Sequence, residues 1–400
     1  MGHVIVVGGG PVGVVAALGA ARSGFEVTVL EAAEQVQEDP RASTLHPSTL
    51  EMLDDLGLVD ELISFGLVAR HFDFWDKPSR SLVARLDHDV LRDETRFPFV
   101  VQTEQHKLAR IGLRRLAEMP NVDVRLGCAF TSLEQTADSV VVHGQAADGP
   151  VRLTGDWVIG CDGGRSAVRK GLGLEFEGYT WPERFVVLTT LFDFADAMSC
   201  SYRSYFADPF EWSNLFKVAG EDLKGRWRVV LPTAVGESDE QALSVEASIE
   251  RLERIWPGAA QGEIVHRKIY RVHQRVAARF RVGRVFLAGD AAHVNNPIGG
   301  LGLNCGIHDA VELVEALVDF RGSQNEDVLE SYERRRRDLN IRYVQQQTVN
   351  NKERLEEKDP VVRAQRLDEL RAIADSEESQ RTFLRRTSLL ESVREPRATA

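Results

Sequence analysis

Short apolar runs separated by amphipathic stretches dominate the first half of the chain. Each run is short enough for a strand, and the stretches between them show helical spacing. The strands that this pattern predicts are 4–7, 26–31, 122–126, 139–143 and 157–161. The helices that it predicts are 13–22, 44–66 and 104–118. A strand, a helix and a second strand in succession are typical of an α/β protein with a parallel sheet.

The pattern changes in the middle of the chain, where aromatic residues gather between Phe176 and Trp227. Aromatic residues favour strands, so this region predicts an antiparallel sheet. Either the sheet only packs on helices, or one of its faces also walls a pocket for an aromatic ligand. An apolar run at 284–290 predicts another buried strand, and the chain after Asn304 is expected to be helical.

Composition narrows the class of partner. The 400 residues suffice for two packed domains, and a net charge of −12 argues against nucleic acid or an anionic membrane as partner. Four cysteines without paired or metal-type spacing predict no metal site and a reduced, cytoplasmic location. The apolar stretch 4–21 contains GGGP at 8–11, which would break a membrane helix, so we expect no membrane span.

The first motif that carries chemistry is GGGPVG at 8–13, between a strand and a helix. Gly8 permits a tight turn, Gly10 lets the backbone approach a pyrophosphate, and Gly13 lets the helix pack closely on the strand. The amino end of the helix attracts the diphosphate. Glu31 ends the next strand, where a carboxylate accepts hydrogen bonds from ribose hydroxyls. The motif predicts an ADP-containing cofactor but does not separate NAD from FAD.

Two later motifs favour FAD. In CDGGRSAVR a strand ends at a glycine turn that carries Asp162, and Ser166 can cap the following helix. The alternative is an ordinary strand-to-helix turn, which would show the same pattern. In FLAGDAAHVNNPIGGLGLN a strand ends at Asp290, whose carboxylate suits the hydroxyls of a ribitol chain. The glycine-rich stretch from Pro297 to Asn304 then opens the backbone to a flat ring, and a helix amino end would stabilise reduced flavin. The alternative is a glycine-rich loop without a ligand.

In order and spacing, the three motifs resemble those of the class A, single-component FAD-dependent aromatic monooxygenases, the 4-hydroxybenzoate hydroxylase-like family. The resemblance extends from residue 4 to about residue 340. It implies an α/β fold with a Rossmann-like FAD-binding domain of the GR2 type, an inserted antiparallel-sheet domain for the substrate, and a helical carboxyl-terminal tail. The expected boundaries are 1–70, 98–175 and 277–340 for FAD, 71–97 and 176–276 for the substrate, and 341–400 for the tail.

The resemblance also implies roles for single residues. Glu31 would bind the adenosine ribose, Gln102 would contact the flavin, and Asp290 would hold the ribitol. Asp162 lies in the motif linked to both FAD and the transient pyridine nucleotide, and Pro297 would present its carbonyl near the reacting oxygen. The residues implied to hold the diphosphate are Gly8, Gly10, Pro11, Val12, Gly13 and Arg41. Those implied to line the isoalloxazine are Gly300, Gly302, Leu303 and Asn304.

The implied activity is hydroxylation of a phenolic or N-heteroaromatic small molecule through a flavin hydroperoxide, with NADPH or NADH as transient reductant and O2 as co-substrate. The absence of a second GxGxxG agrees with a reductant that visits without its own domain. His46 is a candidate base, against the alternative of a helix-surface or packing role, and His293 is expected to brace its loop. Candidates for the pocket wall are His71, Tyr202, Arg203, Tyr205, Trp212, Arg228, Tyr270 and His273.

Four rival functions share part of these features. A flavin-dependent halogenase shares the fold, but its Trp-x-Trp-x-Ile-Pro signature is absent. A NAD-dependent dehydrogenase would leave Asp290 and the glycine-rich loop unexplained. A non-hydroxylating FAD oxidoreductase or a non-catalytic flavin-binding regulator would keep all three motifs. The sequence predicts a monomer or a homodimer and identifies neither the substrate nor the preferred nicotinamide.

Overall fold

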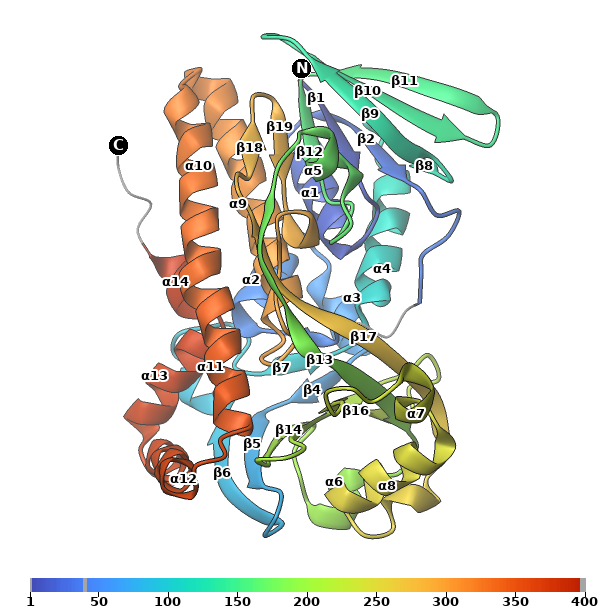
Figure 1. Ribbon diagram of the computed structural model, residues 1–400. Coiled ribbons are helices and arrows are strands. Elements are labelled where there is room, and N and C mark those ends of the chain that lie inside the picture. Colours follow the sequence, from blue (N-terminus) through green and yellow to red (C-terminus); the bar gives the residue numbers. More distant parts are fainter. Residues whose placement is uncertain (1, 39–41, 396–400) are drawn as a thin grey trace.

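The computed structural model describes residues 2–38 and 42–395, and a six-stranded sheet forms its upper half in Figure 1. In order across the sheet, its strands are β18 (Arg281–Val282), β19 (Val285–Leu287), β12 (Trp157–Gly160), β1 (His3–Val7), β2 (Glu26–Glu31) and β8 (Val122–Leu126). All neighbours are parallel except β18 and β19. The central strands are nearly continuous Val, Ile and Leu because both faces of a parallel sheet are buried.

Helices cover the parallel sheet. Helix α1 (Pro11–Arg22) packs between the sheet, α4 (Gln105–Ala117) and the long α9 (Leu301–Ser323). Helices α1 and α9 pack closely at Gly19, where a Cβ would lie in ordinary contact with Val314 at 3.4 Å. A separate meander of β9 (Ala129–Gln135), β10 (Val140–Ala146) and β11 (Gly149–Gly155) extends from the top of the molecule (Figure 1).

The lower half is built on an eight-stranded sheet (Figure 1). Its strands, in order, are β20 (His293–Val294), β17 (Ile264–Ala277), β13 (Phe176–Thr190), β16 (Arg226–Pro232), β15 (Ser213–Val218), β14 (Arg203–Ala207), β5 (His71–Asp76) and β6 (Ser81–Asp87). The predicted antiparallel pairing holds except between β14 and β5, which are parallel. The long β13 and β17 run from one half of the molecule to the other.

The two faces of the eight-stranded sheet pack against different partners. One face, with Leu188, Trp227 and Leu231, packs on α6 (Phe194–Met198) and α8 (Val245–Ile255). The other face forms a cluster with the loop before α9 and with the carboxyl-terminal helices. The aromatic members of that cluster are Phe72, Phe74, Phe185, Tyr205, Trp212 and Phe216. The second face is therefore the one that looks toward the glycine-rich loop.

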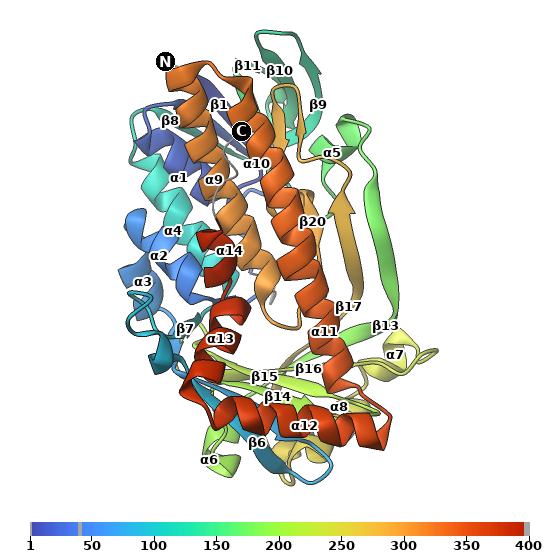
Figure 2. The same ribbon diagram turned by 90° about the vertical axis from the view of Figure 1, so that its left-hand side faces the viewer.

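The carboxyl-terminal helices close the aromatic face. Helix α10 (Glu326–Leu339), a short π-helical segment at 340–345 and α11 (Gln346–Leu355) form one column, after which α12 (Pro360–Ala374) turns under the sheet (Figure 2). Helices α13 (Glu377–Thr387) and α14 (Leu390–Arg394) then return toward α2 (Pro47–Asp55). The tail residues buried in the aromatic cluster are Leu355, Leu370, Leu384 and Leu390. The tail is thus part of the core of this half.

This packing predicts that shortening a tail side chain destabilises the protein. Leu384 is fully buried, so Leu384→Ala should lower the free energy of unfolding by about 2–5 kcal/mol through lost apolar contact and a residual cavity. Val361, which is 64% exposed on α12, provides the control, and Val361→Ala should change stability by less than about 0.5 kcal/mol. Equal urea midpoints for the two variants would show that the tail does not belong to the core.

Several elements of the structure differ from the predicted ones. The segment 44–66 is not one helix but β3 (Thr44–Leu45), α2 and α3 (Val59–Ser64), because Pro47 begins a new helix and Gly57 adopts φ +68°. The strand predicted at 284–290 ends at Leu287, and a 3₁₀ turn, η3 (Gly289–Ala291), follows. Among the strands that were not predicted are β5, β6, β9, β11 and the long β17. Within the described residues, none of the helices combines the length and apolar character that a membrane crossing needs.

Candidate active site

The three sequence motifs meet at one edge of the parallel sheet. Strands β1, β12 and β19 are neighbours and parallel, so the segments that follow their carboxyl ends lie side by side. GGGPVG follows β1, Asp162 follows β12, and Asp290, which is exposed, follows β19 on η3. The contact is close, because a Cβ on Gly289 would lie 2.8 Å from a methyl group of Val12. This edge, at the carboxyl ends of parallel strands, is where α/β sheets bind nucleotides.

The first motif forms an open cradle. Gly8 adopts φ +111°, and a Cβ there would lie 2.4 Å from the carbonyl oxygen of Cys161. A Cβ on Gly13 would lie 1.9 Å from the carbonyl oxygen of Gly8, so both positions require glycine. By contrast, a Cβ on Gly10 would have no described atom within 4 Å. Gly10 begins α1 with Pro11 next and without a described side chain as cap, which leaves the amino end of α1 open to an anion.

Two carboxylates shape this cradle. The oxygens of Glu31 accept hydrogen bonds from the amides of Gly9 (2.6 Å) and Ala33 (2.9 Å), so Glu31 holds the glycine turn in place. One oxygen of Asp162 accepts from the first two amides of α5 (Ala167–Gly171), at 2.6 and 3.0 Å. Its other oxygen, Oδ1, is buried and has no partner among the described residues. Ser166 caps the same helix, as the sequence predicted.

The side chains of Gln102 and Asn304 lie beside the glycine-rich loop and differ in how many of their polar atoms have hydrogen-bond partners. The oxygen of Gln102 accepts from the hydroxyl of Thr44 (2.9 Å), whereas its buried Nε2 donates to nothing in the described structure. The amide of Asn304 donates to the carbonyls of Thr44 (2.8 Å) and Gly300 (2.6 Å) and accepts from the backbone of His46 (2.8 Å). Gln102 therefore keeps a donor for a ligand, whereas the side chain of Asn304 braces the loop.

The glycine-rich loop presents a second open helix end. Gly299 and Gly300 adopt φ +120° and +66°, and Gly300 begins α9 without a described side chain as cap. Gly302 and Leu303 lie in the first turn of α9, so its free amides face the end of the loop. The carbonyl of Pro297 accepts the amide of Gly300 at 3.0 Å, which leaves one lone pair for any other donor.

Three side chains fix the peptide of Gly299. Its amide donates to the hydroxyl of Tyr205 at 2.7 Å, and its carbonyl accepts from Nε2 of His46 (3.0 Å) and Nη2 of Arg203 (3.1 Å). All four residues are buried. The loop between Pro297 and α9 is therefore tied directly to strand β14 of the eight-stranded sheet and to the segment before α2.

His46 is neutral in this position. Burial, followed by the nearby charge of Arg203, holds the pKa of His46 well below its usual range. Because a carbonyl only accepts, Nε2 carries the ring proton and Nδ1 is left as an acceptor. Nδ1 is buried and lacks a partner in the described part of the chain. Nδ1 is thus open to a hydrogen bond from a ligand, and the role of His46 as a base stays a prediction.

Of the proposed pocket-wall residues, the structure brings Arg203 and Tyr205 against the loop, while Trp212 and Tyr270 line the same aromatic cluster. Burial raises the pKa of the Tyr270 hydroxyl, so this group stays protonated. Arg228 is buried on β16 and is paired with Phe216 of that cluster, so its side chain lies on the aromatic face as well. Three candidates lie elsewhere: His71 is half-exposed beside Asp87, Tyr202 packs on the opposite face, and His273 contacts Thr180. Arg41, expected at the diphosphate, lies outside the described residues.

Asp309 is a residue that the sequence did not point to. It is fully buried on α9 and accepts from Nε2 of His293 (2.7 Å), Nε of Arg336 (2.8 Å) and the amide of Gly289 (3.1 Å). His293 thus braces its loop, as expected. Gly289 directly precedes Asp290, so Asp309 positions the backbone that carries the proposed ribitol contact. The sequence did contain a signal for Asp309, namely a carboxylate within an apolar helix. Such a residue is rarely buried without a cationic partner, so a buried ion pair could have been predicted there.

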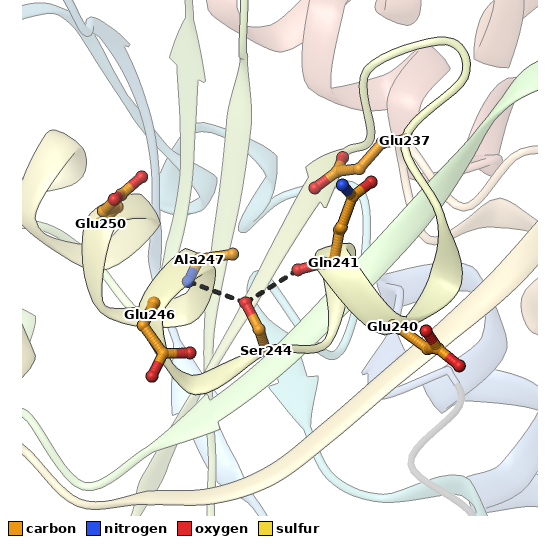
Figure 3. Close-up of a pocket in the computed structure, with 7 residues that line it drawn as sticks. All are labelled: Glu237, Glu240, Gln241, Ser244, Glu246, Ala247 and Glu250. Atoms are coloured by element: carbon orange, nitrogen blue, oxygen red, sulfur yellow. Dashed lines mark hydrogen bonds between the residues drawn. The ribbon is translucent and has the colours of Figure 1, made fainter.

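A pocket on the α8 side of the eight-stranded sheet does not belong to this site. Figure 3 shows it on α7 (Asp239–Ala242) and α8, lined by Glu237, Glu240, Gln241, Ser244, Glu246, Ala247 and Glu250. Glu237 is held by Arg251 at 2.8 Å. The acidic lining would repel a diphosphate, and the three motifs open onto a different edge.

The buried polar groups at the sheet edge fit FAD. The open amino end of α1 suits a diphosphate, and Asp290 lies where the three motifs meet. The free Nε2 of Gln102 and the open amides of α9 suit the polar edge of a flavin ring. A nicotinamide dinucleotide alone would leave the glycine-rich loop and its open helix end without a partner.

Comparison with known proteins identifies the class. A family model described as "FAD binding domain" matches residues 1–347, so the chain belongs to this family. Para-nitrophenol 4-monooxygenase of Pseudomonas sp. (strain WBC-3) is 35% identical over 364 residues, covering 90% of this chain and 89% of that relative. 6-Hydroxy-3-succinoylpyridine 3-monooxygenase of Pseudomonas putida (strain DSM 28022 / S16) is 36% identical over 356 residues, covering 87% and 88%.

A solved structure agrees with these relatives. The crystal structure of p-nitrophenol 4-monooxygenase from Pseudomonas putida DLL-E4 matches with a TM-score of 0.90 and 32% identity, covering 97% of this chain and 99% of that one. The predicted resemblance to the class A FAD-dependent aromatic monooxygenases is confirmed, and with it the fold class. The roles of single residues and the domain boundaries stay predictions.

Proposed function

We propose that this protein hydroxylates a small phenolic or N-heteroaromatic molecule, using FAD, O2 and either NADPH or NADH. The observation that carries the proposal is the convergence of three motif segments at one sheet edge, beside a buried aromatic face that ends at the loop after Pro297. Two relatives named above act on a nitrophenol and on a hydroxypyridine. Both names describe one small aromatic ring with a hydroxyl group, which supports the same substrate class here.

The residues of this chain have separable tasks in the proposal. The amino ends of α1 and α9, with Asp290 and Gln102, bind and orient the cofactor. When bound and reduced, FAD supplies the activation of dioxygen and the transfer of one oxygen atom to the ring. The aromatic face and the carboxyl-terminal helices exclude water from the ring. Nδ1 of His46 is a buried acceptor near the loop that can receive a hydrogen bond from a phenol hydroxyl.

Two further points belong to the proposal. We propose a cytoplasmic location, which is supported by four cysteines that all remain free thiols in the structure. We also propose that the active unit is one chain or a pair of identical chains. Sedimentation of the FAD-loaded protein would distinguish the two assemblies.

The proposed activity predicts a specific kinetic response. Purified, FAD-replenished protein should show flavin absorbance, and 4-nitrophenol or a hydroxypyridine should accelerate NADPH or NADH oxidation by about tenfold or more, because ring positioning precedes oxygen transfer. Oxygen consumption and a hydroxylated product, followed by mass spectrometry, complete the measurement. Protein that holds flavin but responds to no phenol or N-heteroaromatic would support a flavin-binding regulator instead. Protein that holds no flavin would contradict the cradle itself.

A further inference from the structure

Arg203 is a buried cation without a counter-charge. Its side chain is 1% exposed on β14, and its guanidinium lies 3.9 Å from the ring centre of Phe72. Nη2 donates to the carbonyl of Gly299, but Nε and Nη1 have no hydrogen-bond partner in the described structure. No carboxylate of the described residues lies within ion-pair distance of it. A buried guanidinium cannot shed its proton, so this charge and two donors are left for something else.

The titratable groups around Arg203 do not neutralise it. They are His46 from the segment before α2, His88 from the 3₁₀ turn after β6, and Tyr205 from β14 itself. Burial and the charge of Arg203 lower the pKa of His88 to about 4, so both histidines are neutral at pH 7. Asp87 acts on His88 but is not within ion-pair distance of Arg203. The site therefore carries a net positive charge in an apolar setting.

The surroundings of the free donors suit a flat aromatic ligand. Nη2 of Arg203 and Nε2 of His46 bond the same carbonyl of Gly299, so these two nitrogens lie within about 6 Å of each other. Each side chain has unpaired polar atoms, donors on Arg203 and an acceptor on His46. Phe72 and Tyr205 pack edge to face beside them, with ring centres 4.8 Å apart. Cation, acceptor and aromatic walls thus lie together beside the loop that ends at α9.

We propose that Arg203 is the residue that recognises the substrate, by binding the oxyanion of an ionised phenol. This inference rests on the proposed function and adds a substrate class, aromatic molecules that carry an oxyanion on the ring. When a neutral phenol binds, its O–H bond breaks, the proton is released to the solvent, and the electron pair stays on the oxygen facing Arg203. A phenolate ring is more electron-rich and accepts oxygen more readily.

The test is equilibrium binding to the FAD-loaded protein, followed by difference absorbance without NADPH or NADH. The probes are 4-nitrophenol, its non-ionisable methyl ether 4-nitroanisole, and 4-nitrobenzoate. We expect 4-nitrophenol to bind at least tenfold more tightly than 4-nitroanisole. We also expect its pKa to fall by about one unit or more when bound, because an adjacent guanidinium favours the anion. If the pKa of the bound phenol is unchanged in the unmodified protein, the proposal is wrong.

Three variants separate recognition from a purely structural role. Arg203→Gln should retain FAD absorbance but lose both the preference for the anion and the pKa shift, and Arg203→Lys should retain part of each. Arg271→Gln, an exposed arginine of the same sheet, should behave as the unmodified protein. Arg203→Gln protein that holds FAD and still shifts the pKa of 4-nitrophenol would overturn the proposal. Should Arg203→Gln fail to fold, Arg203→Lys carries the same comparison.

The 4-nitrobenzoate probe tests which kind of anion Arg203 binds. Binding of 4-nitrobenzoate that depends on Arg203, without such binding of 4-nitrophenol, would overturn the phenolate assignment in favour of a ring carboxylate. None of these binding measurements requires turnover, so they test the role of Arg203 independently of the proposed function. If only the proposed function is wrong, 4-nitrophenol will bind as its anion through Arg203 but will neither accelerate NADPH or NADH oxidation nor yield a hydroxylated product.

Discussion

Replacing Gly13 by alanine is expected to abolish FAD binding and to destabilise the protein by about 3 kcal/mol or more. The new Cβ would lie 1.9 Å from the carbonyl oxygen of Gly8, which is a backbone atom and cannot rotate away. Relief requires α1 to move off β1, and this movement also removes the open helix end from the diphosphate position. Urea denaturation measures the loss of stability, and flavin absorbance after gel filtration measures the loss of cofactor.

Two glycines of the same segment provide matched controls. Gly19→Ala places a Cβ in ordinary contact with Val314 at 3.4 Å, so it should leave FAD binding intact and stabilise α1 by up to about 1 kcal/mol. Gly10→Ala meets no described atom and should fold normally, but we expect at least tenfold weaker FAD binding because the methyl group enters the cradle. Normal FAD affinity in Gly13→Ala would refute the packing argument, and normal affinity in Gly10→Ala would refute the cradle.

Replacing Asp309 by alanine is the second change with a large expected effect. It leaves the buried guanidinium of Arg336 and the ring of His293 without their carboxylate, which should cost about 3–5 kcal/mol of unfolding free energy. FAD affinity should fall as well, because the amide of Gly289, next to Asp290, loses its acceptor. Asp368→Ala, in an exposed pair with Arg371, is the control and should cost less than about 1 kcal/mol. Equal losses of unfolding free energy in Asp309→Ala and Asp368→Ala would contradict the role of Asp309 in the buried network.

The same network predicts a pH dependence of stability. Burial alone would lower the pKa of His293, but the Asp309 carboxylate outweighs it and raises this pKa to about 10. A histidine whose pKa is raised by folding contributes stability that is complete below its ordinary pKa of about 6.5 and is lost as the pH rises through the folded value. Thermal melting between pH 6 and 10 should therefore show a falling midpoint, and His293→Gln should flatten that slope.

The sequence alone determined the nucleotide half of the site. Buried parallel strands are continuous apolar runs, so β1, β2 and β12 and the residues at their ends were visible in the local pattern. Glycine spacing then marked the turns, because a positive φ or a close backbone approach leaves few other residues possible. Gly8, Gly13 and Asp290 could be placed from these local requirements without any knowledge of distant contacts.

Only the tertiary structure decided the substrate half. Arg203 donates a hydrogen bond to the carbonyl of Gly299, which is 96 residues away in the sequence. Asn304 accepts one from the backbone amide of His46, which is 258 residues away. The leucines of the carboxyl-terminal helices complete the aromatic core in the same way. These pairings arise when separate sheets and helices pack together, and periodicity within one segment carries no information about which distant surface it will meet. That is why the sequence predicted a compact set of residues for the cofactor, whereas only the fold distinguished Arg203 from the other pocket-wall candidates.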